Sequence, residues 1–442
     1  MKHGIRRFLS AKSGIVAIIQ TAFANLAVMG VNLLSGILTA RSLGPGGRGL
    51  LAGVIMWPQF LAYGMTIGIP IASVYWLKRR PDLSTELAGA GLLLSVGFGL
   101  LGALVGAAVI PYSLHTYPAS AIHLAQLWAL VTPLELLAVT LIAQAQAADA
   151  FSNYNFFRFL SPFSVLVILA VEKALGHLTY STAAFAYLLG GTPAMLWIAH
   201  WAWRYFRPTL HSTIAASRLL LGYGVRAWGA DLLGTVASQV DRILVVGLLA
   251  PEFMGLYVIA QSAAGVLAFI PTAIAPITMP RSTNLHTGDI LILTGLAARA
   301  TLCLMLLASL PLLFFGDFLL SLVYGSRFTG AAAVLPFLVV EAIANGLTSV
   351  LAQAFLATGF PGTVSMLQGC GLLTSIPLLY WMIPRFGLRG AGCALMLSTL
   401  CRLMLVLLNF PYKLKSRPPG LIMRRTEFLG LFTSAWQRIT AE

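Results

Sequence analysis

The sequence predicts an all-α integral membrane protein with about twelve transmembrane helices in two six-helix bundles. The first observation is composition: hydrophobic residues fill 58% of the 442 positions and charged residues only 9%. That leaves too little polar surface to cover a water-soluble globule. The second is that the apolar runs are continuous, which favours helices over the alternating strands of a barrel. The third is an internal repeat.

The apolar runs are each close to the roughly 20 residues that a helix needs to cross the hydrocarbon core. We expect spans at residues 15–40, 50–76, 86–110, 122–148, 159–176, 182–203, 219–248, 253–280, 289–315, 331–358, 364–384 and 391–411. The first run follows a basic segment, as a secretory signal does. It is too long for the apolar part of a signal peptide, so we expect an uncleaved first helix.

The repeat relates residues 37–70 to residues 243–276, with no gap and an offset of 206 positions. Leucine and alanine matches are common in so apolar a chain, but two prolines and a glycine kept in register are not. The matched pairs include Pro45/Pro251, Gly49/Gly255 and Pro70/Pro276. Because six predicted spans lie in each half, both copies have the same orientation in the membrane, which makes this a parallel repeat.

The repeat divides the chain into three parts. We expect an N-terminal six-helix lobe at residues 1–207, a C-terminal six-helix lobe at residues 208–415 and a basic cytoplasmic tail at residues 416–442. The tail mixes apolar and basic side chains, which suits a helix on the inner membrane surface, and a disordered tail fits it equally well.

The positive charge follows the predicted topology. A net charge of +15 would indicate a nucleic-acid partner in a soluble protein. Here, with the amino terminus inside, eighteen lysines and arginines fall on the cytoplasmic side and six outside. This bias places both termini in the cytoplasm and assigns the charge to anionic lipid head groups, not to nucleic acid.

The sequence contains no pattern that indicates a bound cofactor or a catalytic site. The four cysteines, Cys303, Cys370, Cys393 and Cys401, lie in predicted spans without metal-ligand spacing, which indicates neither a disulfide framework nor a zinc site. No glycine-rich nucleotide loop of the Walker type is present. The outer loops are short, so we expect a transporter and not an enzyme.

Charged side chains inside predicted spans are the main functional candidates, because each costs about 2.5–3.5 kcal/mol at the centre of the bilayer. Six such residues occur: Glu135, Asp231, Arg299, Glu341 and Arg402 near the midplane, and Arg226 nearer the cytoplasmic end. Three are positive and three negative, so mutual neutralisation is the structural alternative.

Polar residues also form stripes at helical spacing. On the span 219–248 the stripe consists of Asp231, Thr235, Ser238 and Arg242. The first span is similar, with Asn25 at the repeat position of Asp231 and Asn32 at that of Ser238. We therefore expect the first and seventh helices to line a polar cavity.

Two junctions resemble a known family. The first reads Ala40-Arg41-Ser42-Leu43-Gly44-Pro45-Gly46-Gly47-Arg48-Gly49, and the second Val240-Asp241-Arg242-Ile243 followed by Gly255-Leu256-Tyr257. Both resemble the Wzx-type oligosaccharide flippases, in the polysaccharide transporter family of the multidrug/oligosaccharidyl-lipid/polysaccharide (MOP) superfamily. The resemblance implies two lobes around a central cavity in the prokaryotic cytoplasmic (inner) membrane. It also implies a cargo of polyprenyl-diphosphate-linked oligosaccharide, moved to the outer leaflet for surface polysaccharide export.

These observations predict an alternating-access flippase with the following residue roles. Substrate binding is assigned to Arg226, Arg299, Arg402, Asn25, Asn32 and Arg242, because arginine binds a diphosphate bidentately and the others lie on the polar stripes. A coupling H+ or Na+ is assigned to Asp231, Glu135 and Glu341. Contact with the departing head group is assigned to Arg41 and Arg48, for which snorkelling to the interface is the structural alternative.

Two other functions stay open. An ion-coupled multidrug or cation exporter of the same superfamily would use Asp231 and Glu341, although three buried arginines argue against a cationic cargo. A membrane sugar polymerase or ligase is the more distant alternative, and the short outer loops weigh against it. For the flippase, a polysaccharide polymerase and glycosyltransferases are the expected protein partners.

Overall fold

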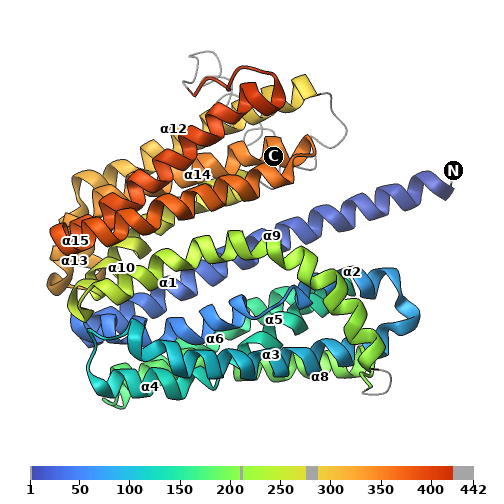
Figure 1. Ribbon diagram of the computed structural model, residues 1–442, viewed down its shortest axis with the longest axis horizontal. Helices are drawn as coiled ribbons and strands as arrows, with labels where there is room; N and C mark the ends of the chain where they lie inside the picture. The colour runs from blue at the N-terminus through green and yellow to red at the C-terminus, as the bar shows by residue number, and fades with distance from the viewer. Residues whose placement is uncertain (1, 210–212, 275–286, 422–442) are drawn as a thin grey trace. The chain divides into compact units, whose positions relative to one another are not determined.

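The computed structural model describes residues 2–209, 213–274 and 287–421, with side chains from residue 25 on except those of residues 229–241, 287 and 361. Every regular element in these residues is a helix, which confirms the all-α prediction (Figure 1). In chain order they are α1 (Lys2–Gly64), α2 (Ile69–Arg79), η1 (Pro81–Leu83), α3 (Ser84–Ser113), α4 (Ala119–Ala129), α5 (Thr132–Ala147), α6 (Phe151–Ala174), α7 (Tyr180–Leu189), α8 (Thr192–Phe206), α9 (Thr213–Leu248), α10 (Pro251–Gly265), η2 (Val266–Ala268), α12 (Thr287–Phe314), α13 (Gly316–Tyr324), η3 (Ser326–Ala333), α14 (Leu335–Ala357) and α15 (Pro361–Leu414).

Among the described residues, eight helices are long and apolar enough to cross a membrane, or nine if the bent pair α4–α5 is one span. Two of the eight, Asn25–Gly64 with 40 residues and Gly362–Leu414 with 53, are about twice the length of one crossing. Each breaks at a glycine with positive φ, Gly44 at 68° and Gly387 at 57°. With the bent pair taken as one span and these two helices as two crossings each, the described helices allow eleven crossings, and α9 is a further long helix at the predicted seventh span. The chain is a multi-pass membrane protein.

The chain forms two compact units. Unit 1 comprises Met1–Ile259 and Leu320–Gly330, and unit 2 comprises Ala260–Leu319 and Ala331–Glu442. These units are defined by how compactly the chain packs, whereas the predicted lobes are defined by the sequence repeat. The lobe boundary after residue 207 therefore stays a prediction. The tail at residues 422–442 lies outside the described residues.

The core of unit 1 forms where α3 and α5 pack against α2, α8 and α9. Polar groups buried there are paired: Ser95 Oγ lies 2.7 Å from Thr140 Oγ1, and Gln144 Nε2 donates to the carbonyl oxygen of Ala88 at 3.2 Å. Such bonds hold membrane helices together at around 1 kcal/mol each.

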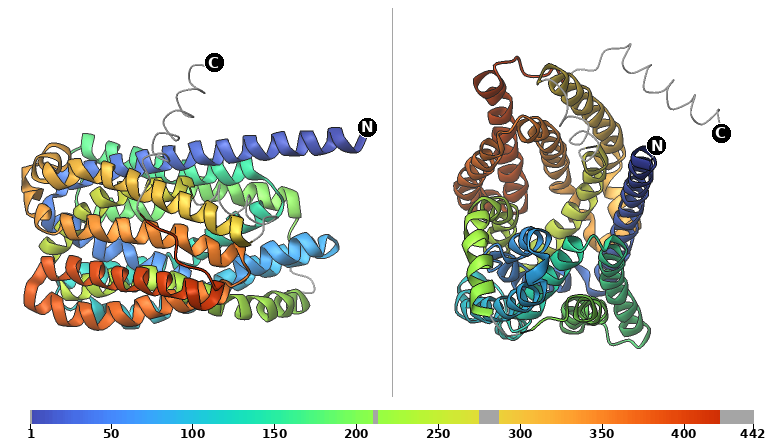
Figure 2. Two further views of the ribbon diagram at one scale, coloured as in Figure 1. Left: turned by 90° about the horizontal axis from the view of Figure 1, so that it is seen from above. Right: turned by 90° about the vertical axis from the view of Figure 1, so that its right-hand side faces the viewer.

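In unit 2, α14 packs against both α12 and α15 (Figure 1). Phe355 and Phe410 meet edge to face in its core, with ring centroids 5.0 Å apart. The two halves of α15 fold back on each other, because Ser398 Oγ donates to the carbonyl oxygen of Gly371 at 3.0 Å across the break at Gly387. Figure 2 shows these halves side by side.

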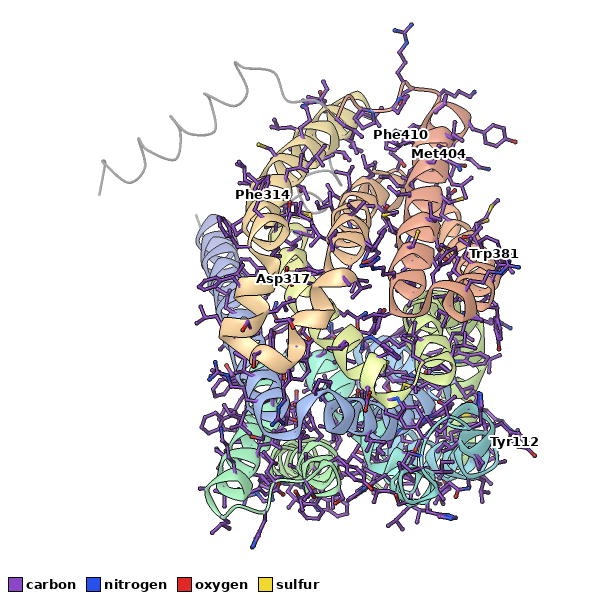
Figure 3. The ribbon with its side chains drawn as sticks, turned by 90° about the vertical axis from the view of Figure 1, so that its left-hand side faces the viewer. Tyr112, Phe314, Asp317, Trp381, Met404 and Phe410 are labelled. Carbon is purple, nitrogen blue, oxygen red and sulfur yellow. The ribbon has the colours of Figure 1, made fainter. Side chains whose placement is uncertain are left out.

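Large apolar side chains cover the outside of the helices. Tyr112 is 83% exposed, Phe314 77% and Met404 63%. Figure 3 shows Tyr112 and Trp381 pointing away from the ribbon. A surface with so many exposed apolar side chains is far too hydrophobic for water and suits lipid.

Among the glycines that the structure describes, the two whose added Cβ would lie closest to another backbone atom are in unit 1, where the two copies of the repeat meet. A Cβ atom on Gly49 would lie 1.6 Å from the carbonyl oxygen of Pro251, and one on Gly255 would lie 1.9 Å from that of Pro45. Only glycine permits so close an approach. The contact is reciprocal because Pro45 and Gly49 are the repeat partners of Pro251 and Gly255. We call these four residues the Pro-Gly crossing.

Candidate functional site

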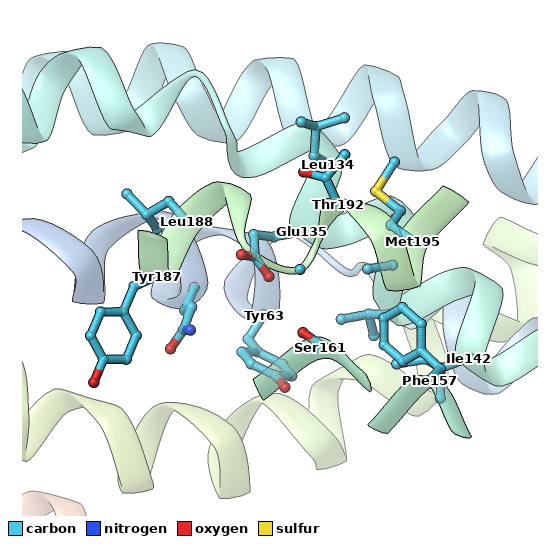
Figure 4. A pocket seen from close by; sticks show the side chains of 14 residues that line it. Tyr63, Leu134, Glu135, Ile142, Phe157, Ser161, Tyr187, Leu188, Thr192 and Met195 are labelled. Carbon is cyan, nitrogen blue, oxygen red and sulfur yellow. The ribbon is translucent and has the colours of Figure 1, made fainter. Parts of the chain in front are cut away.

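Unit 1 contains a cavity of about 210 Å³ between four spans, which we call the unit 1 cavity. Its polar lining comes from the second half of α1, from α5, α6 and α7, and from α8: Gln59, Tyr63, Glu135, Ser161, Tyr187 and Thr192. Its apolar lining includes Leu134, Ile142, Phe157 and Met195. Figure 4 shows Glu135 near the middle of these side chains, with Tyr187 on one side and Met195 on the other.

The unit 1 cavity forms where two spans are interrupted. One bends by 44° between α4 and α5, and the other breaks between α7 and α8 at Gly190 and Gly191. Both α5 and α8 begin with a Thr-Pro pair, at residues 132–133 and 192–193. Proline is tolerated there because the first backbone N–H groups of a helix have no intrahelical partner. The positive ends of two helix dipoles are thus placed at the cavity, with Glu135 in the first turn of α5.

A buried arginine lies beside the unit 1 cavity. Arg48 is 8% exposed, and its Nε and Nη1 atoms have no hydrogen-bond partner among the described residues. Its guanidinium carbon lies 6.0 Å from the ring centroid of Tyr187, which lines the cavity. Burial raises the pKa of the Tyr324 phenol, and the positive charge of Arg48 offsets part of that rise. Arg48 therefore does not snorkel to the interface, which was the structural alternative to its predicted role.

Arg41, the other residue assigned to the exit, has a structural role at the end of α13. Its Nε donates to the carbonyl oxygen of Val323 at 2.9 Å, and its Nη2 donates to that of Leu322. Carbonyls in the last turn of a helix lack intrahelical donors, so these bonds cap α13.

In unit 2, Arg402 lies near the middle of the second half of α15. Its Nη2 donates to Oδ1 of Asn345 at 2.7 Å, and its Cδ lies 3.1 Å from where a Cβ on Gly371 would be. Arg402 and Asn345 line a small cavity of about 80 Å³, together with Thr348, Ser349 and Gln368. The guanidinium is therefore held in place by a neutral amide.

The other deep charges of unit 2 also have contacts. Thr399 Oγ1 donates to Oε1 of Glu341 at 3.3 Å, which joins α15 to α14. Arg299, on α12, donates from Nη1 to the carbonyl oxygen of Gly420 at 3.1 Å. The chain after α15 therefore lies against α12 at the level of this arginine.

The remaining predicted residues lie on α1 and α9 of unit 1. Asn25 and Asn32 are exposed on α1, and Arg226 and Arg242 are exposed on α9. The side chain of Asp231 lies outside the described residues. An exposed charge within a span is tolerated toward water or head groups and not toward lipid.

The sequence prediction found Glu135 but missed the other polar groups around it: Gln59, Tyr63, Ser161, Tyr187 and Thr192. The usable signal was the Thr-Pro pair that interrupts two apolar runs, at residues 132–133 and 192–193. Proline inside an apparent span often marks a broken helix, and broken helices line binding sites in transporters.

Comparison with known proteins gives a family and a relative. A family model described as "Polysaccharide biosynthesis protein" matches residues 38–333. The probable flippase AglR of Haloferax volcanii is 27% identical over 216 residues, which are 47% of this chain and 45% of that protein. The match thus spans less than half the length of this curated relative.

Solved structures show the fold. The lipid II flippase MurJ in an inward closed conformation superposes with a TM-score of 0.74 at 13% identity, covering 90% of this chain and 88% of that one. An inward-facing MATE family multidrug resistance transporter of the MOP superfamily gives 0.65 at 14% identity, covering 90% and 98%. A MOP superfamily transporter from Pyrococcus furiosus gives 0.62 at 16% identity, covering 90% and 95%. The expected MOP fold is confirmed.

Proposed function

Because the chain belongs to the polysaccharide biosynthesis protein family, we propose that it is a flippase for polyprenyl-diphosphate-linked oligosaccharide. The cargo would pass from the inner to the outer leaflet by alternating access between two lobes. Support comes from the probable flippase AglR in sequence and from a fold shared with the lipid II flippase MurJ. In this proposal the chain is a transporter of the cytoplasmic membrane with both termini inside, and it performs no chemical step.

We assign the main contact with the diphosphate head group to Arg402. Its Nη2 donates to Asn345, and its side chain packs closely against Gly371, so the guanidinium is held at a defined position within the span. Arginine in this setting is suited to a bidentate contact with a diphosphate oxygen pair. We assign auxiliary contacts to Arg299, Arg226, Arg242, Asn25 and Asn32. Arg48, buried beside Tyr187, is assigned to the departing head group.

Glu135 is our assignment for the coupling H+ or Na+. Its carboxyl group lines an open cavity, together with hydroxyl and amide oxygens that suit a hard cation. Glu341, in contrast, accepts a hydrogen bond from Thr399 at a helix contact, so we give it a lesser role. Asp231 keeps its predicted role as a further proposal.

Replacing Arg402 with alanine is expected to abolish surface polysaccharide in cells that lack the natural chain. A hydrogen bond to a charged group contributes about 1.5–3 kcal/mol, so head-group binding should weaken by roughly tenfold or more. Export is measured as surface polysaccharide, and binding as retention of radiolabelled polyprenyl-diphosphate-linked sugar by the purified variant.

The matched control is Arg385→Ala, which removes an exposed arginine on the same helix whose guanidinium carbon lies 4.4 Å from the Trp381 ring centroid. This variant should export normally. Full export with Arg299 and Arg402 both replaced by alanine would refute the head-group assignment. Proton-linked efflux of a cationic dye, with no lipid flipping, would favour the exporter alternative.

A further inference from the structure

We propose that the unit 1 cavity binds one sugar ring of the cargo. The proposal rests on the flippase function and adds to it a site for the sugar.

The size of the cavity fits one ring. Its volume is about 210 Å³. Pockets for drug-sized ligands are larger, at about 300–1,000 Å³. The cavity is therefore better suited to a single ring than to a whole oligosaccharide or a typical drug.

The lining matches the two kinds of surface that a sugar ring presents. Hydroxyl groups at the ring edge can donate to the Glu135 carboxylate and form hydrogen bonds with Gln59 and Ser161, which share the cavity. The apolar C–H face of the ring can pack against aromatic side chains such as Phe157 and Tyr63. A bare cation would leave the apolar wall unused, and an apolar drug would leave six polar side chains unpaired.

The cavity is open on the side of α1. Gln59 is exposed, and Tyr63 and Leu134 are 44% and 37% exposed, while Glu135 lies deeper. A ligand would therefore meet Gln59 and Tyr63 first and then reach the carboxyl group. Side chains at the rim and at the base of the cavity can be tested separately.

The charges at this cavity suit the neutral sugar better than the diphosphate. An ionised Glu135 would repel a diphosphate at close range, at a cost that rises as water is excluded. The helix N-termini of α5 and α8 and the nearby Arg48 offset the single carboxylate, which suits a neutral ligand.

Cysteine protection tests the proposal in the full chain. The native cysteines at 303, 370, 393 and 401 are replaced by alanine, and Ser161→Cys or Thr192→Cys introduces a thiol that lines the unit 1 cavity. A small methanethiosulfonate reagent labels the thiol in nanodiscs. The probe is the pool of sugars that mild acid releases from the lipid carrier of the source cells. The matched control is Ser349→Cys, in the small cavity beside Arg402.

We expect the released sugars to slow labelling of Ser161→Cys or Thr192→Cys at least twofold, and to leave Ser349→Cys unchanged. Adding Gln59→Leu should remove the protection. Labelling that no sugar slows, in variants that still flip lipid-linked sugar, would overturn the sugar site. Protection by sodium chloride to which the sugars add nothing would also overturn it, in favour of a cation site alone. Sugar protection in a chain that flips no lipid would instead leave the sugar site standing and refute the flippase function.

Discussion

Alanine at Gly49 is expected to destabilise the protein by roughly 3 kcal/mol or more, at or above the upper end of ordinary overpacking. The added Cβ would lie 1.6 Å from the Pro251 carbonyl oxygen and 2.5 Å from its carbonyl carbon. These are backbone atoms, so no rotamer change can relieve the overlap and one helix must move. The measurement is the midpoint of thermal unfolding of the purified variant in detergent, followed by size-exclusion chromatography.

Gly36→Ala is the matched control, because Gly36 lies on the same helix α1 and a Cβ there meets nothing within 4 Å. Since alanine favours helix over glycine by about 0.5–1 kcal/mol, this variant should be at least as stable as the natural chain. Equal midpoints for Gly49→Ala and Gly36→Ala would show that the Pro-Gly crossing is not a tight contact.

The crossing also predicts a coupling between distant positions. Gly255→Ala should be about as harmful as Gly49→Ala, because its Cβ would lie 1.9 Å from the Pro45 carbonyl oxygen. The double variant should lose less stability than the sum of the single losses, since either substitution already separates the two helices. Additive losses would indicate two independent contacts in place of one reciprocal crossing.

The Pro-Gly crossing shows which features of the fold the sequence predicts and which it does not. The repeat identifies Pro45 with Pro251 and Gly49 with Gly255. It does not predict that the two copies touch. Identity at a fixed offset reports similar folding of two segments, while their mutual packing depends on how all the helices around them are arranged.

The candidate site shows the same limit. Glu135 was predicted because a charge inside an apolar run is rare and costly. Gln59, Ser161 and Thr192 carry no such signal, since neutral polar residues are common in membrane helices and often serve only as hydrogen-bond partners between them. Their shared cavity depends on two helix breaks and on four spans meeting. Arg48 was missed as a buried residue because Tyr324, near it in unit 1, is 276 positions away in the sequence.

Glu135→Gln is expected to abolish gradient-driven transport while leaving the fold and the sugar site in place. Glutamine keeps the size and much of the hydrogen-bonding capacity of the side chain, but it cannot exchange a proton or balance a sodium ion. Proteoliposomes that contain the variant should therefore move labelled lipid-linked sugar no faster with an imposed proton or sodium gradient than without one. Equilibration without a gradient should continue.

The matched control is Asp82→Asn, which neutralises an exposed carboxylate whose Oδ2 lies 2.9 Å from Nη2 of Arg80. Exposed ion pairs contribute little, so both stability and driven transport should stay near those of the natural chain. Gradient-driven accumulation by Glu135→Gln at the natural rate would rule Glu135 out as the coupling group and direct attention to Glu341 and Asp231. If Glu135→Gln loses driven transport while the sugars still protect Ser161→Cys, the cavity has two separate uses. The charge of Glu135 would then serve the coupling ion, and the shape of the cavity would serve the sugar.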